Sequence, residues 1–165
     1  MNILEALKGI RTIILDVDGV LTNNQLHITE QGHLLRSMYV KDGYAIHRAG
    51  IAGLKIAVIT GGKSEGVVKR LKGLDIVDIY TNCTDKMEAF EELVMMYELD
   101  KSQILYLGDD IPDLPVMIQV GFAACPADAA PEIKRICKYI SPYKGGEGCV
   151  RDLIEKILKL QGKWP

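Results

Sequence analysis

Five short, strongly apolar segments, each followed by a polar or glycine-containing turn, constrain the fold of this chain more than any other feature. They span residues 12–15, 55–59, 76–80, 104–107 and 122–125. Nearly continuous apolar strands of this kind are typical of a parallel sheet that is covered on both faces. Helical periodicity lies between the segments, most clearly over residues 85–99 and 150–160. This alternation of strands and helices predicts the α/β class with a doubly wound parallel sheet.

One segment interrupts the alternation. Residues 25–28 and 34–40 have the pattern of two strands, and the polar turn between them contains Gly32. We therefore predict a β-hairpin inserted directly after the first strand, with a disordered surface loop as the alternative. A chain of 165 residues with 48% hydrophobic and 25% charged residues is expected to form one globular domain, residues 1–165, without a separate cap domain.

Charge and cysteine content exclude several classes of function. The net charge of −2 indicates neither nucleic-acid binding nor an anionic membrane surface. The four cysteines include no C-x-x-C pair, which argues against a zinc site and against a disulfide framework. No apolar run approaches the roughly 20 residues of a membrane helix, and the N-terminal residues lack the apolar core of a signal peptide. We therefore expect a cytoplasmic protein.

Polar residues that suit phosphate chemistry follow the predicted strands in order. They are Asp16 and Asp18 after the first strand, Thr60 and Gly61 after the second, Lys86 at the start of the long helix, and Asp109 after residues 104–107. Ligands of open α/β sheets bind outside the carboxyl ends of the strands, so these residues are expected at one edge. Each of them alone has an ordinary explanation, such as a turn, a helix cap or a solvated lysine. Their joint appearance favours a site.

The three aspartates predict a metal ion. Asp16, Asp18 and Asp109 would repel one another if they were crowded together without a cation. Oxygen ligands without histidine or cysteine favour Mg²⁺ over zinc.

The same residues predict phosphoryl transfer. A carboxylate such as Asp16 can attack phosphorus and hold the phosphoryl group as an aspartyl phosphate. Lys86, the Thr60 hydroxyl and the Gly61 N–H group would neutralise the equatorial oxygens. Asp18 would protonate the leaving oxygen and later activate the hydrolytic water.

The run Asp16-Val17-Asp18-Gly19-Val20-Leu21-Thr22, followed by Thr60-Gly61, Lys86 and Gly108-Asp109-Asp110, resembles the four motifs of the haloacid dehalogenase superfamily. The resemblance covers essentially the whole chain. It implies that Asp16 is the nucleophile and Asp18 the general acid/base, that Mg²⁺ is bound by Asp16, the Asp18 carbonyl and Asp109, and that phosphate is bound by Thr60, Gly61 and Lys86. Asp110 and Asp113 are expected near the metal. The second aspartate favours phosphoester hydrolysis over dehalogenation.

A narrower resemblance rests on the hairpin and on residues 40–44, 113–117 and 144–148. Together these are similar to the 3-deoxy-D-manno-octulosonate 8-phosphate phosphatases, which are capless tetramers of lipopolysaccharide precursor synthesis. The resemblance implies a phosphorylated sugar acid as substrate and a homotetramer in which a neighbouring subunit covers each active site. It also implies further substrate contacts from Lys41, Asp42, Gly43 and Arg70.

The choice of sugar stays open at this point. Octulosonate phosphatases tend to carry arginine where this chain has His47 and Gly62, and a branch acting on nonulosonate 9-phosphates tends to carry glutamate at the position of Gly62. Arg70, Lys41 or a neighbouring subunit's Arg151 would compensate for the missing cations in binding the sugar carboxylate. A silent scaffold subunit would lack the nucleophile or metal ligands, and none is missing. A phosphotransferase would need a lid that this short chain cannot supply alone.

Overall fold

The computed structural model describes residues 2–165 and has a six-stranded parallel sheet at its centre. The strands lie in the order β5-β4-β1-β6-β7-β8. Their bounds are β1 (Thr12–Leu15), β4 (Lys55–Ile59), β5 (Asp78–Tyr80), β6 (Ile104–Leu107), β7 (Phe122–Cys125) and β8 (Tyr139–Ile140). The chain starts at the centre, winds out to β5, and returns past β1 to build the other half. The predicted doubly wound α/β fold is confirmed.

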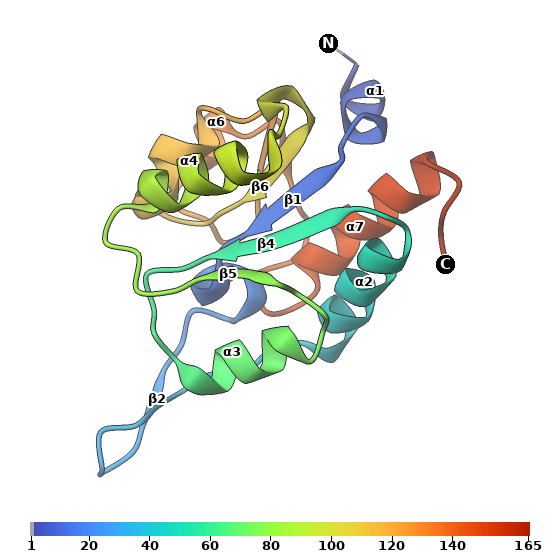
Figure 1. The fold of residues 1–165 in the computed structure, drawn as a ribbon. Coiled ribbons are helices and arrows are strands. Elements are labelled where there is room, and N and C mark those ends of the chain that lie inside the picture. Colours follow the sequence, from blue (N-terminus) through green and yellow to red (C-terminus); the bar gives the residue numbers. More distant parts are fainter. Residues whose placement is uncertain (1) are drawn as a thin grey trace.

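Helices cover both faces of the sheet (Figure 1). On one face lie α4 (Lys86–Tyr97), α5 (Leu114–Met117) and α6 (Pro131–Ile136), and on the other α1 (Ile3–Lys8), α2 (Val40–Ile51), α3 (Glu65–Lys72) and α7 (Cys149–Leu160). Three short turns, η1 (Val17–Leu21), η2 (Lys101–Gln103) and η3 (Ile111–Asp113), complete the elements. In β1, Ile13 and Leu15 join one buried cluster and Ile14 joins the other. Because successive side chains of a strand point to opposite faces, a sheet covered twice requires uninterrupted apolar strands.

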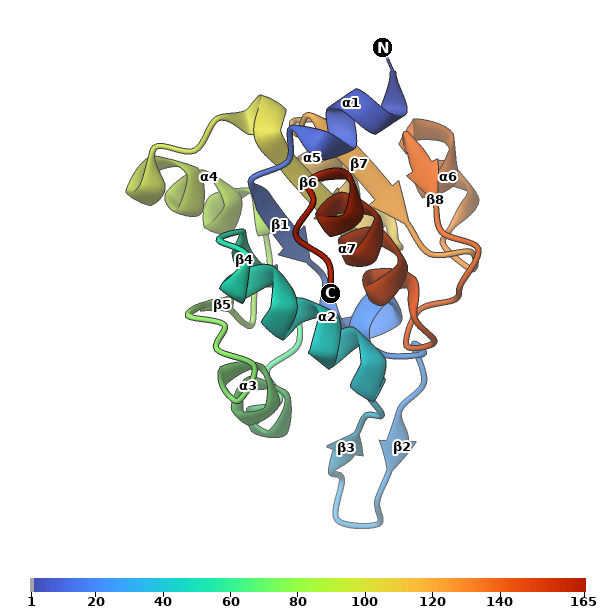
Figure 2. The same cartoon turned by 90° about the vertical axis from the view of Figure 1, so that its right-hand side faces the viewer.

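The predicted hairpin is present but shorter than the sequence suggests. Strands β2 (His27–Ile28) and β3 (Leu34–Leu35) pair antiparallel, and the hairpin projects away from the body of the molecule (Figure 2). The prediction of a strand up to residue 40 is wrong, because Val40 begins α2. Ala45, Ile46 and Ala49 of this helix are buried against the core, a spacing that suits a helix and not a strand.

Two exclusions drawn from composition can be compared with the structure. Among residues 2–165, no helix combines the length and the apolar character that crossing a bilayer requires. All four cysteines are free, and two of them, Cys125 and Cys149, are buried. Buried thiols of this kind behave as small apolar side chains.

Candidate active site

The loop that follows β1 carries Asp16 and Asp18 to the carboxyl edge of the sheet. Asp18 has an extended backbone, and Gly19 then takes a left-handed conformation with φ of +88°. A Cβ atom on Gly19 would overlap with the Asp109 carboxylate, so glycine is needed both for the turn and for the close approach. The Thr22 hydroxyl accepts a hydrogen bond from the Gly19 N–H at 3.2 Å and closes the loop.

A second glycine segment supports this loop from outside. The Gly146 N–H donates to the Val20 carbonyl oxygen at 2.9 Å. A Cβ atom on Gly145 would overlap with the Gly19 carbonyl oxygen. The segment at residues 144–148 therefore packs directly against the loop that bears the predicted nucleophile, a role that the sequence did not indicate.

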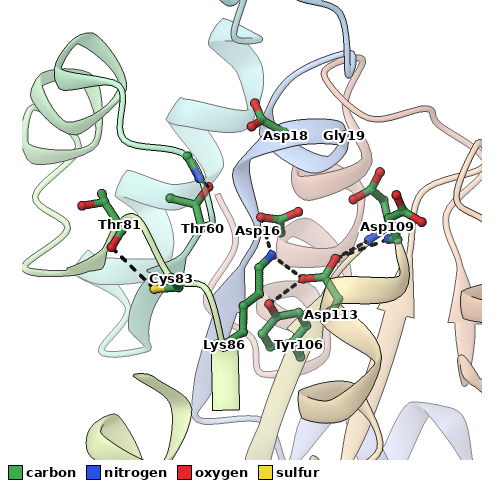
Figure 3. A network of polar contacts seen from close by, with 12 residues as sticks. Asp16, Asp18, Gly19, Thr60, Thr81, Cys83, Lys86, Tyr106, Asp109 and Asp113 are labelled. Carbon is green, nitrogen blue, oxygen red and sulfur yellow. Dashed lines mark hydrogen bonds and ion pairs between the residues drawn. The ribbon is translucent and has the colours of Figure 1, made fainter. Parts of the chain in front are cut away.

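Asp113 is enclosed by hydrogen-bond donors (Figure 3). Its Oδ1 accepts from Lys86 Nζ at 2.7 Å and from the Tyr106 hydroxyl at 2.7 Å. Its Oδ2 accepts from the N–H groups of Asp109 at 3.0 Å and Asp110 at 3.4 Å. A carboxylate has about four acceptor positions, and these donors use all of them. Asp113 therefore orients Lys86 and the loop after β6.

Three carboxylates crowd around one ammonium group. Asp16, Asp109 and Asp113 each offer an oxygen within 4.8 Å of the others, and Lys86 Nζ lies 2.8 Å from Asp16 Oδ1. Burial, followed by repulsion from Asp113, raises the pKa of Asp16. Burial, followed by repulsion from Asp16 and Asp113, raises the pKa of Asp109. Burial opposes the charge on Lys86, but attraction to Asp16 and Asp113 outweighs it and raises the pKa of the amine.

This cluster fits a divalent cation. Three carboxylates and one ammonium leave two negative charges, which Mg²⁺ would balance. Since the oxygens of Asp113 are engaged, Asp16 and Asp109 are the better candidates for direct ligands. Among the described residues, the only side chain that hydrogen-bonds Asp109 is Asn24, at a long 3.5 Å. Carboxylate oxygens without imidazole or thiolate suit Mg²⁺.

A cavity of about 330 Å³ opens above these groups. Its lining includes the predicted residues Asp16, Asp18, Thr60, Gly61, Lys86 and Asp109. Asn24, Cys83 and Thr84 also line it and were not predicted, because single polar residues in loops carry no periodic or motif signal. The structure thus brings the predicted nucleophile, acid/base, phosphate and metal residues to one cavity, and their individual roles stay predictions.

Four predicted substrate-binding residues lie outside this cavity: Lys41, Asp42, Gly43 and Arg70. Lys41 lines a separate cavity of about 420 Å³ beside α7. Asp42 is buried, and its Oδ1 accepts from the Arg151 N–H at 2.8 Å. Gly43 lies so close to the Arg70 guanidinium that a Cβ atom would overlap with it, which brings α2 against α3. A contact of these residues with substrate stays a prediction.

The groups invoked for carboxylate recognition also have partners inside the chain. Arg151 stacks over the Trp164 ring at 4.6 Å, and Trp164 meets Tyr44 edge-on at a centroid distance of 6.0 Å. The C-terminal tail thus folds back on α2 and α7. His47 Nδ1 lies 3.3 Å from Asp75 Oδ2 on the surface.

One contact in the site involves a residue that sequence reasoning missed. Arg36, from the hairpin, donates to both oxygens of Asp18. A lone arginine after a short strand gives no signal in the sequence.

The comparisons with known proteins agree with this geometry. A model of the haloacid dehalogenase-like hydrolase family matches residues 68–153. A 3-deoxy-D-manno-octulosonate 8-phosphate phosphatase of Escherichia coli strain K12 is 35% identical over 162 residues, which cover 98% of this chain and 86% of the relative.

The chain belongs to the 3-deoxy-D-manno-octulosonate 8-phosphate phosphatase family of haloacid dehalogenase-like hydrolases.

Solved structures of this family superpose closely. The crystal structure of the phosphatase from Yersinia pestis has a TM-score of 0.95 at 35% identity, covering 98% of this chain and 87% of that one. The phosphatase from Moraxella catarrhalis, in complex with a magnesium ion, a phosphate ion and a KDO molecule, has a TM-score of 0.93 at 32% identity, with coverages of 96% and 91%. The predicted family and the predicted enzyme class, a phosphoric monoester hydrolase, are confirmed.

Proposed function

We propose that this enzyme hydrolyses 3-deoxy-D-manno-octulosonate 8-phosphate to the free sugar acid and inorganic phosphate, with Mg²⁺ as cofactor. The observation that carries the proposal is the buried Asp16 carboxylate, which Lys86 Nζ holds at 2.8 Å in a cavity shared with Asp109. The choice of sugar follows from the names of the relatives. The acidic cluster supplies the reason for Mg²⁺.

The reaction proceeds in two displacements. An oxygen of Asp16 attacks phosphorus, the bond between phosphorus and the sugar oxygen breaks, and Asp18 gives its proton to that oxygen. Water then attacks the phosphorus of the aspartyl phosphate and passes a proton to Asp18. The Asp16 carboxylate is regenerated and inorganic phosphate leaves.

Several groups hold the phosphoryl group during these steps. Thr60 and Gly61 donate to its oxygens, and Lys86 adds positive charge beside the nucleophile. Asp16, Asp109 and the Asp18 carbonyl are the proposed ligands of Mg²⁺. When bound, the ion neutralises the charge that otherwise repels a phosphate dianion from these carboxylates.

A nonulosonate 9-phosphate is the alternative substrate. Gly62 lines the active-site cavity and offers neither of the side chains expected for the two sugar classes. The relatives named as octulosonate phosphatases favour the eight-carbon sugar.

We further propose that residues 1–165 act as one catalytic domain in a homotetramer, located in the cytoplasm. The hairpin supports assembly, because it projects from the body and exposes the apolar residues Leu26, Ile28, Leu34 and Leu35. A protruding apolar hairpin favours burial by other copies of the chain. Light scattering of the purified protein should give four times the 18.3 kDa mass of one chain.

The proposed function is tested by phosphate release from both sugar phosphates, with Mg²⁺ and with chelator. We expect the eight-carbon ester to have the higher kcat/KM, and we expect chelator or Asp16→Asn to abolish its hydrolysis. Asp75→Asn is the matched control, because Asp75 is an exposed aspartate outside the site and should leave activity unchanged. Preference for the nine-carbon ester would change the substrate. An Asp16→Asn enzyme as fast as the unmodified protein would overturn the mechanism.

A further inference from the structure

Arg36 forms a two-point contact with Asp18. Its Nε donates to Asp18 Oδ1 at 2.6 Å and its Nη2 to Asp18 Oδ2 at 3.3 Å. Arg36 lies just beyond β3, at the base of the hairpin. Its side chain is only 9% exposed, whereas that of Asp18 is 36% exposed. A buried guanidinium is costly unless it is paired, and Asp18 is the carboxylate that pairs it.

The guanidinium is enclosed between two loops of the active site. A Cβ atom on Gly62 would lie 3.4 Å from Arg36 Nη2 and 3.5 Å from Asp18 Oδ2. Arg36 and Asp18 line one small cavity together with Thr60 and Gly62. The ion pair therefore sits where the loop after β1 meets the loop after β4, beside the predicted phosphate-binding residues.

The orientation of the Asp18 carboxylate rests on one partner, whereas the other proposed catalytic carboxylates are held by burial or by several donors. Asp16 is buried against Lys86, and Asp113 has four donors. Across residues 2–165, no side chain other than Arg36 hydrogen-bonds the Asp18 carboxylate. Within this described part of the chain, the rotation of that carboxylate is therefore restrained by no other hydrogen bond.

Attachment of the hairpin is a weaker explanation for the pair. The base of the hairpin is already tied to the core by the antiparallel bridge between Thr22 and Met38. A contact made only to attach the hairpin would need just one oxygen of Asp18. The two-point contact of the guanidinium with both oxygens also fixes the orientation of the carboxylate.

We propose that Arg36 is a positioning residue that orients the Asp18 carboxylate for proton exchange with the leaving oxygen. Oδ1 stays on Arg36 Nε, and Oδ2, held at the longer distance, exchanges the proton. In the first displacement the proton passes from Oδ2 to the sugar oxygen. In the second it passes from water to Oδ2. The inference rests on the proposed function, since it assigns Arg36 to the acid/base of that reaction.

The test compares two phosphate esters that differ in their need for a proton. A sugar alkoxide is a poor leaving group and needs protonation, whereas p-nitrophenolate leaves without it. For Arg36→Ala we expect kcat/KM on 3-deoxy-D-manno-octulosonate 8-phosphate to fall about 10–100-fold, because losing the orienting contact removes only part of the roughly 100–10,000-fold contribution of general acid catalysis. On p-nitrophenyl phosphate we expect less than about a 3-fold fall. The ratio kcat/KM is used because it reports the steps up to loss of the leaving group.

Two further variants separate positioning from charge. Arg36→Lys keeps the charge but loses the fork, so we expect it to fall roughly 3–10-fold on the sugar ester and to stay near unmodified activity on the aryl ester. It carries the test if Arg36→Ala does not fold. Lys63→Ala, which removes an exposed cation beside Gly62, is the matched control and should leave both esters unchanged.

A double variant shows whether Arg36 acts through Asp18. If it does, Asp18→Asn with Arg36→Ala is no slower on the sugar ester than Asp18→Asn alone, because coupled residues are not additive. Equal losses on both esters, or single Arg36 variants as fast as the unmodified enzyme, would overturn the inference and leave the proposed function intact. An unmodified enzyme that hydrolyses no sugar phosphate would instead refute the proposed function.

Discussion

Replacing Lys86 with methionine removes the cation that the buried carboxylates share. Lys86 Nζ lies 2.8 Å from Asp16 Oδ1 and 2.7 Å from Asp113 Oδ1, and the Lys86 and Asp113 side chains are 6% and 1% exposed. Removing one partner of a buried ion pair costs about 3–5 kcal/mol. Since two carboxylates lose their cation here, we expect the upper part of that range, about 4–5 kcal/mol in the free energy of unfolding at pH 7.5 without Mg²⁺.

Urea unfolding in the presence of chelator measures this loss. Lys101→Met is the matched control, because Lys101 pairs with Glu91 at 2.8 Å while both side chains stay largely exposed, and it should cost less than about 1 kcal/mol. The Lys86→Met variant should also have no phosphatase activity.

The pH dependence of the loss gives a second check. Burial and repulsion already raise the pKa of Asp16, and removing Lys86 raises it further above the unfolded value. The unmodified protein already carries this penalty up to its own folded pKa of about 7, so the extra penalty of Lys86→Met grows only as the pH rises above about 7 toward the higher pKa of the variant. The deficit of Lys86→Met should therefore grow between pH 7 and pH 9. A deficit equal to that of Lys101→Met at pH 7.5, or one independent of pH, would refute this account of the cluster.

Three other substitutions test the packing and burial of individual residues. Gly145→Ala places a Cβ atom on the Gly19 carbonyl oxygen, so it should lower the free energy of unfolding by about 1–3 kcal/mol and also lower kcat. Gly50→Ala in α2 meets no atom of the described residues within 4 Å, so it should raise the free energy of unfolding by about 0.5–1 kcal/mol. Thermal unfolding compares the two variants. Burial raises the pKa of Asp42 to about 6, and its Oδ2 has no hydrogen-bond partner among residues 2–165. Asp42→Asn should therefore gain stability over the unmodified protein as the pH rises from 4 to 6, by up to about 3 kcal/mol. Urea unfolding at pH 4 and pH 7 checks this, and an unchanged difference between the two pH values would contradict it.

The fold was predictable where one physical requirement governs a whole segment. A strand covered on both faces is apolar throughout, so the bounds of β1, β4, β6 and β7 match the segments expected from the sequence. Strand β8 was missed because two residues form no pattern. The start of α2 was missed because Val40 continues the apolar run that follows the hairpin, so no break in the pattern marks the first residue of the helix. The helical spacing of apolar residues appears only further along the chain.

The site was predictable to the extent that sheet topology alone places its residues. Parallel strands end at one edge, so Asp16, Thr60 and Asp109 had to lie near one another once their strands were recognised. The side-chain contacts that complete the site are not determined by the sheet topology. Asp113 takes up its four donors, and Arg36 reaches Asp18 from 18 residues away, because loops fold back over the edge along paths that no periodicity encodes. The chemistry of the motifs is therefore local in the sequence. The proposed orientation of Asp18, in contrast, depends on Arg36 of the hairpin, the part of the fold in which this chain departs from strand–helix alternation.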